Sequence, residues 1–385
     1  MIKLYETNGN LYQFDAVVVE CKQVKKGYAI ALDQTAFFPG GGGQEADTGE
    51  LSGQAVLGFL TENEMIYHIV AEEIPVNSKV TGVVDQNIRF PRMQNHSGEH
   101  IFSGLAHMHF GAENVGFHLG ENAMTIDLDT ELTAEQVYFL EDETNKIIWQ
   151  NVPITVAIYS PEEASKHTYR SKKELNEPIR LVTVTHADCC ACCAPHVAMT
   201  GEIGIFKITS FERYKGGTRL FAMCGEMALT YLRSRMIDLS ECSSMLSSKI
   251  NEVPKTLTHL LDEKAKLDYK ATQMERALAQ TLVEANPNTN VLFSEHLSMP
   301  GAIFAVQQAL KTRPFFGAFF GNAKDGYRFA IGSEGLPLRM HTKTINEGIG
   351  GRGGGSDSLL QGSASKTEEE IRTFIDEWFK TVTEG

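Results

Sequence analysis

The fold of this chain is decided by Arg92-Met-Gln-Asn-His-Ser-Gly-Glu-His100 together with Cys192-Cys-Ala-Pro-His196. Each segment carries two metal-binding side chains four residues apart. On a helix this spacing directs both side chains from one face, close enough to bind a single ion. Neutral imidazoles with a thiolate are ligands that suit Zn²⁺, so we expect the two distant segments to build one zinc site. The four candidate ligands are His96, His100, Cys192 and His196.

Four of the seven cysteines crowd into positions 189–193, beside the second ligand pair. The odd number and the crowding argue against a secreted disulfide framework and favour reduced thiols near a metal. Cys189 and Cys193 are alternatives to Cys192 as the thiolate ligand. Four protein ligands on tetrahedral zinc are typical of a structural site, whereas a catalytic site keeps one position open. The sequence leaves both questions open.

The composition is that of a globular protein with more than one domain. With 385 residues, 42% of them apolar and 22% charged, the chain has material for two or three domains with sizeable cores. Its first residues alternate like a strand and lack the apolar run of a signal peptide. No segment approaches the roughly 18 consecutive apolar residues of a membrane span. We expect a cytoplasmic protein with no membrane partner.

The chain is acidic overall and basic in places. A formal net charge of −14 disfavours nucleic acid as a partner. Two basic groups interrupt this balance, and bunched basic residues can form a local phosphate-binding face. They are Lys166, Arg170, Lys172 and Lys173, followed by Arg213, Lys215, Arg219, Arg233 and Arg235. An ordinary solvated surface is the alternative.

Alternating apolar and polar residues predict short strands in residues 1–88. The clearest segments are 14–20, 28–32, 65–70 and 80–84. Short strands broken by turn residues at this spacing are typical of a small β-barrel or sandwich, so we assign 1–88 to a β-barrel domain. Between the strands lies Phe37-Phe-Pro-Gly-Gly-Gly-Gly-Gln44, a loop whose backbone must closely face another group.

Helices and strands mix in residues 89–236 without a steady βαβ order, which predicts an α+β zinc-binding domain. A first helix is expected from about Asn87 through His109, carrying both early histidines. Thr133-Ala-Glu-Gln136 is a capping box that begins a second helix, which ends near Trp149. Further strands are expected at 154–158, 179–184 and 204–209.

A long helix or coiled coil is expected over residues 237–286. Apolar positions step by four and three residues from Leu246 to Leu278, which is the seam of a coiled coil. Pro254 implies a kink or a late start. No glycine or proline turn is visible inside the run, which argues against an αα-hairpin. We therefore favour a helix that either dimerises the chain or separates its domains. A homodimer is therefore expected.

Residues 287–385 are expected to form a small C-terminal α/β domain. Strands are predicted at 302–306 and 315–320, and a last helix at 367–381. In this domain Gly348-Ile-Gly-Gly-Arg-Gly353 satisfies the pattern G-x-G-x-x-G, but no apolar helix follows it, so dinucleotide binding is not expected. A glycine-rich turn around Arg352 offers backbone amides and a guanidinium to a phosphate. A surface loop without a ligand is the alternative.

Three segments, in this order, resemble the editing region of alanyl-tRNA synthetases and of the free-standing AlaX alanyl-tRNA editing proteins. They are Phe37-Phe-Pro-Gly-Gly-Gly-Gly-Gln-Glu-Ala-Asp-Thr-Gly49, Asn95-His-Ser-Gly-Glu-His100 and Cys192-Cys-Ala-Pro-His-Val-Ala-Met-Thr-Gly-Glu-Ile-Gly204. Phe117-His-Leu-Gly120 and Thr125-Ile-Asp-Leu128 strengthen the match. Gly350-Gly-Arg-Gly-Gly-Gly355 is similar to the glycine-rich stretch that follows editing in those synthetases. The resemblance spans nearly the whole chain without the ATP-binding aminoacylation motifs, and it is closest to the long form of AlaX.

The resemblance implies a function in translation fidelity: hydrolysis of the ester that joins a wrong amino acid to tRNA(Ala). The implied substrates are Ser-tRNA(Ala) and, second to it, Gly-tRNA(Ala). The same resemblance makes 89–236 an editing domain with Zn²⁺ on the four candidate ligands, and 287–385 a domain for tRNA binding or dimerisation, with Arg352 as a substrate-binding candidate. The implied pocket residues are Gly40, Gly41, Gly42, Gly43 and Gln44, with Gln94 and Ser97 as catalytic candidates and Thr35, Ser103 and Thr125 as weaker ones. Cys189, Cys190 and Cys193 depart from the family pattern.

An aminoacyl ester is already activated, so its hydrolysis needs a positioned water and charge stabilisation but no nucleotide cofactor. A site that hydrogen-bonds the serine hydroxyl leaves polar groups unpaired when alanine enters, which favours serine. Two rival functions stay open. His96-Ser-Gly-Glu-His100 also fits the H-x-x-E-H signature of a class of zinc peptidases, in which Glu99 is the general base. The other rival is a non-catalytic tRNA-binding module with a structural zinc.

Overall fold

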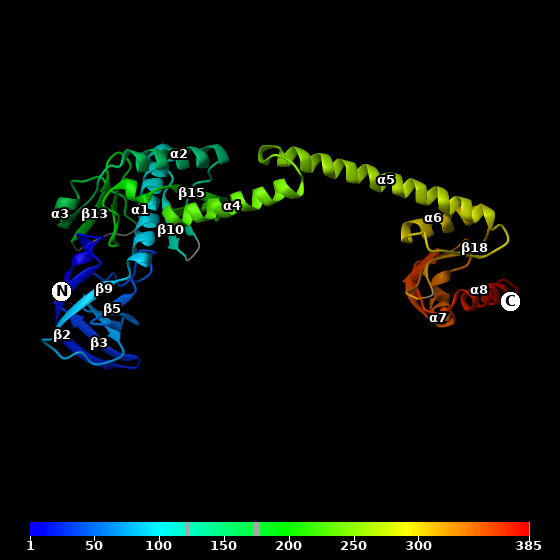
Figure 1. The fold of residues 1–385 in the computed structure, drawn as a ribbon, viewed down its shortest axis with the longest axis horizontal. Coiled ribbons are helices and arrows are strands. Elements are labelled where there is room, and N and C mark those ends of the chain that lie inside the picture. Colours follow the sequence, from blue (N-terminus) through cyan, green and yellow to red (C-terminus); the bar gives the residue numbers. More distant parts are fainter. Residues whose placement is uncertain (121–122, 172–177, 323, 385) are drawn as a thin grey trace. The chain divides into compact units, whose positions relative to one another are not determined.

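The computed structural model describes residues 1–120, 123–171, 178–322 and 324–384. They form two compact units, Met1–Ser240 and Glu241–Gly385 (Figure 1). Helices and strands mix in both units, so the expected α+β class is confirmed, while the domain boundaries expected at 88, 236 and 286 stay predictions. Within the described ranges, every helix is either too short or too polar to serve as a membrane span.

The N-terminal part of the first unit is a seven-stranded sheet that curls into a half-barrel, the form taken by the expected small barrel (Figure 1). Its strands in spatial order are β6 (Gln54–Ala55), β5 (Gly49–Leu51), β9 (Lys79–Val84), β2 (Gln13–Val24), β3 (Gly27–Leu32), β8 (Met65–Val70) and β7 (Gly58–Glu62). The long strand β2 pairs with β9 through its first half and with β3 through its second. A register shift between Val18 and Glu20 allows the bend, because a bulge increases local twist.

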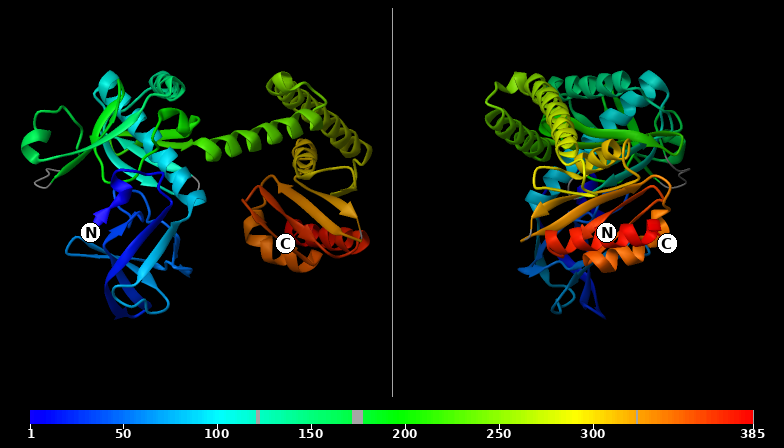
Figure 2. Two further views of the ribbon diagram at one scale, coloured as in Figure 1. Left: turned by 60° about the vertical axis from the view of Figure 1, so that its left-hand side comes forward. Right: turned by 90° about the vertical axis from the view of Figure 1, so that its right-hand side faces the viewer.

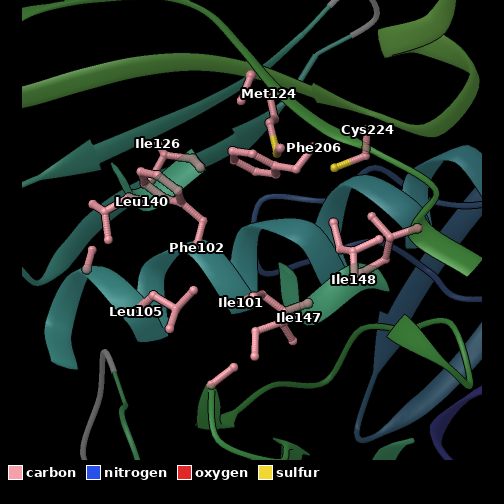
Figure 3. Packing of buried hydrophobic residues seen from close by; sticks show 14 of the residues in the cluster. Ile101, Phe102, Leu105, Met124, Ile126, Leu140, Ile147, Ile148, Phe206 and Cys224 are labelled. Carbon is pink, nitrogen blue, oxygen red and sulfur yellow. The ribbon is translucent and has the colours of Figure 1, made fainter. Parts of the chain in front are cut away.

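The rest of the first unit contains two further sheets and several helices, most of which pack around one core. The sheets are β10 (Asn114–Leu119), β11 (Met124–Leu128), β16 (Gly217–Cys224) and β15 (Phe206–Tyr214), and then β12 (Ile154–Tyr159), β13 (Ile179–Val184) and β14 (Asp188–Ala191). The helices are α1 (Gln86–Phe110), α2 (Ala134–Gln150), the short α3 (Pro161–Ala164) and most of α4 (Gly225–Met245). Small elements complete the unit: β1 (Ile2–Lys3), β4 (Gln34–Thr35), η1 (Leu4–Glu6) and η2 (Thr200–Ile203). Ile101, Phe102 and Phe206 meet in the shared core (Figure 3).

Helix α1 confirms the helix expected from Asn87 through His109, and it is the central element of the unit. The side chain of Asp85 caps its first turn, and Gly111, in a left-handed conformation, ends it. Every residue from Met93 to Ala106 is buried. Helix α2 begins with the expected capping box of Thr133 and Gln136.

The seam predicted from Leu246 is interrupted, so a single helix over that whole run is wrong. Helix α4 (Gly225–Met245) ends first, and α5 (Val253–Ala285) begins after η3 (Ile250–Glu252), with Pro254 in its first turn. Ser247 has φ of 49°, and the amides of Ser248 and Ser247 bond back to Ser243 and Ser244. This is a Schellman ending with serine in the position that glycine usually takes, which is why no glycine announced it. The late start that Pro254 implied is confirmed.

The second unit is a five-stranded sheet between two helical layers (Figure 2). Its strands in spatial order are β17 (Val291–Ser294), β18 (Phe315–Asn322), β19 (Gly326–Ser333), β21 (Leu359–Ala364) and β20 (Gly351–Gly355), and its remaining helices are α6 (Met299–Ala309), α7 (Leu338–Ile349) and α8 (Glu368–Glu384). Strand side chains alternate between the layers, since Phe315 and Phe319 join the core with α7 and α8, whereas Phe316 and Ala318 join the core with α5 and α6. The predicted strand 315–320 and helix 367–381 are confirmed.

The strand predicted at 302–306 is wrong, because these residues lie in helix α6. Ser298 caps this helix and Pro300 stands in its first turn. Ala302, Ala305 and Val306 are buried on one face, at helical spacing. A short apolar run has no polar residues to reveal its period, so alternation could not separate the two states.

Candidate functional site

The four predicted metal ligands come together in the first unit. His96 and His100 lie one turn apart on α1, 2% and 3% exposed, and their ring centroids are 5.3 Å apart. The ring of His196 lies 4.8 Å from that of His96 and 4.6 Å from that of His100. Cys192 Sγ lies 3.6 Å from His96 Nε2 and 3.5 Å from His196 Nε2. One nitrogen or sulfur atom from each residue lies within 4.8 Å of all the others, a spacing at which one ion can contact all four.

The turn that carries Cys192 and His196 is held by Arg180 of β13. Its guanidinium donates to the carbonyl oxygens of Cys192 at 2.6 Å and of Ala194 at 2.9 Å. A third hydrogen bond reaches the carbonyl of Glu6. These bonds satisfy carbonyls of an irregular segment, which no strand or helix could satisfy. Arg180 was not predicted, because it precedes Cys192 by twelve residues and lies on strand β13.

Each histidine is oriented by a polar side chain at its other ring nitrogen. The Nδ1 atoms of His96 and His100 lie 2.8 Å from Gln44 Oε1 and 3.0 Å from Asp188 Oδ2. Both oxygens accept hydrogen bonds only, so in the neutral rings Nδ1 carries the proton and Nε2 keeps its lone pair. His196 Nδ1 lies 3.0 Å from the hydroxyl of Ser97. Such outer partners fix the tautomer and ring orientation of metal-binding histidines, so the donor set fits zinc.

The charges of the cluster favour one thiolate. Burial disfavours it, but the neighbouring imidazoles of His96, His100 and His196 hold the pKa of the Cys192 thiol well below its usual range. Burial, reinforced by the charge on His100, lowers the pKa of His196 to about 3. For His100, burial opposes protonation, yet hydrogen bonds to Asp188 and Cys192 raise its pKa well above the ordinary value. Metal ligands must be deprotonated, and a thiolate among imidazoles is such a set. A divalent cation would therefore take the place of the protons in this cluster.

The structure separates the crowded cysteines. Cys190 lies with His100 and Asp188 in a second group of possible metal ligands. Asp188, however, already accepts two hydrogen bonds from Arg170, at 2.8 and 3.0 Å, and burial raises the pKa of Cys190 to about 11. Cys189 accepts a hydrogen bond from Thr183, and Cys193 is exposed. Among the described residues, Cys192 is therefore the cysteine that faces all three imidazoles.

The two catalytic candidates occupy supporting positions. Ser97 is fully buried, and its hydroxyl contacts His196 Nδ1 and accepts a hydrogen bond from the amide of Val197. Gln94 donates to the carbonyl of Glu202 at 2.8 Å and packs against Gly225, so its amide is directed away from the cluster. Ser97 thus positions a candidate ligand, and Gln94 joins α1 to η2.

The weaker candidates and the general base of the peptidase hypothesis are also held elsewhere. Thr35 contacts His68 Nε2 at 2.8 Å. Ser103 donates to the buried carboxylate of Glu99 at 2.5 Å, and Asn114 donates to the same oxygen. Thr125 lies inside β11. Because Glu99 is engaged by two donors and belongs to neither possible ligand group, this geometry does not support its role as a general base.

The glycine loop forms a tight turn that ends at the cluster. Gly40 to Gly43 all have positive φ, from 60° to 139°, a conformation that side chains rarely adopt. Side chains at Gly41 and Gly42 would meet nothing within 4 Å, whereas one at Gly43 would collide with the backbone of Phe117. The turn places Gln44, 3% exposed, against His96. The Nε2 group of Gln44 is buried and has no hydrogen-bond partner among the described residues.

Two arginines of α1 fix this loop from the turns that precede the histidines. Arg89 is fully buried and pairs with Asp47, and it also donates to the carbonyls of Gly9 and Ala36. Arg92 donates to the carbonyl of Ala46 at 2.6 Å. One helix therefore carries two candidate ligands and the anchors of the loop that orients the first of them. This pairing has no local signal in the sequence, since Asp47 and Arg89 are 42 residues apart.

A pocket of about 1000 Å³ opens on the His100 side of the cluster. Its lining includes Asn114, Arg170, His186, Asp188 and Cys190. The Asp188 carboxylate thus touches the cluster through His100 and the pocket through Arg170. A cavity of this size with convergent polar groups can hold a ligand as large as a nucleoside with an attached amino acid.

Two of the predicted basic residues pair with acidic residues outside the cluster, and the glycine-rich segment belongs to the second unit. Arg219 pairs with Asp127, and Arg213 with Glu131. Lys172 and Lys173 lie outside the described residues. In the second unit Arg352 is exposed in β20, directly after α7. The glycine-rich segment therefore follows a helix and forms a strand, the reverse of the dinucleotide-binding order.

This chain is similar in sequence to alanyl-tRNA editing proteins and to an alanine–tRNA ligase. Residues 179–221 match the family model of the threonyl and alanyl tRNA synthetase second additional domain. The chain is 28% identical to the alanyl-tRNA editing protein AlaX-L of Pyrococcus horikoshii, over 96% of each protein. It is 27% identical to the alanyl-tRNA editing protein Aarsd1-B of Xenopus laevis, over 94% of this chain and 91% of that protein. It is also 25% identical to the alanine–tRNA ligase of Thermofilum pendens, over 97% of this chain and 43% of the ligase.

Proposed function

The chain belongs to the AlaX family of alanyl-tRNA editing proteins, and from that premise we propose that it is a zinc-dependent hydrolase that deacylates mischarged Ser-tRNA(Ala). Gly-tRNA(Ala) is the second proposed substrate. The observation that carries the zinc dependence is the inward-facing set of His96, His100, Cys192 and His196, each histidine with its Nδ1 atom held from outside. A tRNA substrate makes the cytoplasm the proposed location.

The four ligands would hold zinc, and bound zinc would supply a Lewis acid and positive charge beside the ester. This chain supplies the orientation of those ligands through Gln44, Ser97 and Asp188. Arg170 and Asp188 place a fixed charge pair in the wall of the adjoining pocket. We propose that this pocket receives the aminoacylated 3′ end and excludes bulk water from it.

Selectivity for serine requires a group that hydrogen-bonds the serine hydroxyl. The hydroxyl of Ser97 and the amide of Gln94 are already used inside the protein, at His196 and at Glu202. Among the side chains that the structure describes, the Nε2 group of Gln44 is a buried donor beside the ligands that has no hydrogen-bond partner. We propose Gln44 as the residue that contacts the aminoacyl group, because a donor left without a partner disfavours alanine strongly.

Deacylation of defined substrates tests the function directly. The protein is incubated with Ser-tRNA(Ala) and with Ala-tRNA(Ala), each with and without a zinc chelator, and the loss of the amino acid is followed. We expect faster loss of serine only, abolished by the chelator and by His100→Ala. tRNA binding without any faster loss of serine would support the non-catalytic module instead, and full activity in a verified zinc-free protein would refute the metal dependence.

The second unit supports the proposed partners. Exposed Arg352 lies in the glycine-rich strand β20 next to α7, which carries Arg339 and Lys343. Basic side chains beside an open backbone suit phosphates, so we propose this face as a contact for the tRNA backbone. We also propose a homodimer formed through the long helix α5.

A further inference from the structure

The tip of the glycine loop is a two-residue turn whose amides are free. The amide of Gly41 bonds to the carbonyl of Gln44 at 2.9 Å, and the amide of Gln44 bonds back to Gly41 at 3.1 Å. Between them, Gly42 and Gly43 have φ of 60° and 87°, the values of a type I′ turn. Among the described residues, neither the amide of Gly42 nor that of Gly43 has a hydrogen-bond partner. In such a turn successive N–H bonds point to the same side of the backbone, as they do in the first turn of a helix.

This turn lies beside the ligand cluster. A side chain at Gly43 would collide with Phe117, whose ring centroid lies 4.9 Å from that of His96. The carbonyl of Gly43 accepts a hydrogen bond from the amide of Leu119 at 3.0 Å. The next residue, Gln44, contacts His96 Nδ1 through its Oε1 atom, and its buried Nε2 group has no partner among the described residues. The loop thus brings three unused donor groups to the His96 side of the cluster.

A second turn of the same sheet shows that the glycine at position 42 is not required by the turn alone. Strands β5 and β6 are joined by Ser52 and Gly53, whose φ values are 49° and 79°. The amide of Ser52 bonds to the carbonyl of Thr81 at 2.8 Å, whereas the corresponding amide of Gly42 is free within the described chain. A side chain at Gly42 would meet nothing within 4 Å, so the space beside this amide is open. Glycine leaves the amide uncovered, which suits the close approach of a ligand.

We propose that the amides of Gly42 and Gly43 bind the carbonyl oxygen of the aminoacyl ester and stabilise the negative charge that this oxygen gains during hydrolysis. This inference rests on the proposed deacylase function. The oxygen of a water molecule bonds to the ester carbon, and an electron pair of the C=O bond moves to the carbonyl oxygen. When the C=O bond forms again, the bond to the ribose oxygen breaks, and that oxygen takes the proton that the water gave up. The products are free serine and a tRNA with a terminal hydroxyl.

The turn is fixed before a substrate arrives, as this kind of stabilisation requires. Directly after it, Arg92 donates to the carbonyl of Ala46 at 2.6 Å, and the fully buried Arg89 pairs with Asp47. The Nε2 group of Gln44 stays free for the serine hydroxyl. The loop therefore supplies separate donors for the reacting oxygen and for the side chain of the substrate.

Exchange of a single amide for an ester tests the proposal without adding a side chain. Glycolic acid in place of glycine, introduced during in vitro translation of the full-length protein, replaces the N–H group by an oxygen atom. The kcat and KM of Ser-tRNA(Ala) deacylation are then measured. Gly42→glycolic acid and Gly43→glycolic acid should each lower kcat about 10²- to 10³-fold with little change in KM, because an oxyanion donor acts in the transition state.

The matched control is Gly53→glycolic acid, which makes the same exchange in the similar turn between β5 and β6 and should leave kcat unchanged. Zinc content and melting temperature, measured for every variant, show whether the fold is kept. Gly42→Ala keeps the amide and adds a side chain, so it should raise KM rather than lower kcat.

Two results would overturn this proposal alone: an active wild type with unchanged kcat in both ester variants at positions 42 and 43, or a rise in KM without a fall in kcat. In the second case the amides would bind substrate and transition state equally. A wild type that releases no serine would overturn the proposed function together with this proposal.

Discussion

Asp188→Asn isolates the contribution of an orienting residue to metal binding. The carboxylate is almost fully buried and lies between His100 Nδ1 at 3.0 Å and the Arg170 guanidinium at 2.8 and 3.0 Å. Asparagine keeps the shape but removes the negative charge that holds the proton on His100 Nδ1. The Nε2 lone pair that faces Cys192 then becomes a poorer and less ordered ligand.

Loss of such an outer partner lowers metal affinity about 10- to 100-fold, which is about 1.4 to 2.7 kcal/mol of binding free energy. The substitution should also lower the folding stability of the metal-free protein. Arg170, 14% exposed, keeps its charge without a carboxylate, and breaking a buried pair costs about 3 to 5 kcal/mol of folding free energy. We expect the lower end, because Arg170 also lines the open pocket.

Zinc affinity is measured by competition with a chromophoric chelator, and the stability of the zinc-free protein by urea unfolding. The control is Asp127→Asn, which breaks the similar two-point pair with Arg219, away from the cluster. Asp127→Asn should lower stability and leave zinc affinity unchanged, whereas Asp188→Asn should lower both. Wild-type zinc affinity in the Asp188 variant would refute the orienting role.

Three further changes test the fold around the site. Burial lowers the pKa of His68 to about 4, so as the pH falls the unfolded chain binds a proton at this residue before the folded protein does. Between about pH 6.5 and pH 4, the free energy of unfolding should therefore fall by about 3 kcal/mol more in the wild type than in His68→Gln. Urea unfolding at these two pH values measures the difference. Gly98→Ala should cost about 1 to 3 kcal/mol, because the added carbon collides with Cys224 and presses on Phe206; an unchanged melting temperature would contradict this packing. Thr133→Ala removes the cap of α2 and should cost about 1 kcal/mol, whereas the adjacent Ala134→Ser should cost less.

The sequence could predict that the four candidate ligands lie together, because they occur as two local pairs. His96 and His100 share one helical face, and Cys192 and His196 share one turn, so each pair is visible at a fixed spacing. The orienting residues have no such spacing. Gln44 comes from a loop 52 residues before His96, and Asp188 lies 88 residues after His100. Only the folded backbone brings these atoms together, and a single sequence contains no signal that residues so far apart in the chain lie close together in the fold.

The two wrong secondary-structure predictions have different physical causes. At 302–306 every residue is apolar, and a pattern without polar positions cannot distinguish a period of two from a period of 3.6. At 246–252 the heptad spacing continued through residues that belong to neither α-helix, and the positive φ of Ser247 gave no warning of the break because it needed no glycine. Local sequence preference predicted the wrong secondary structure where several weak signals competed. It succeeded at Thr133 and Pro254, where one residue has a specific stereochemical effect.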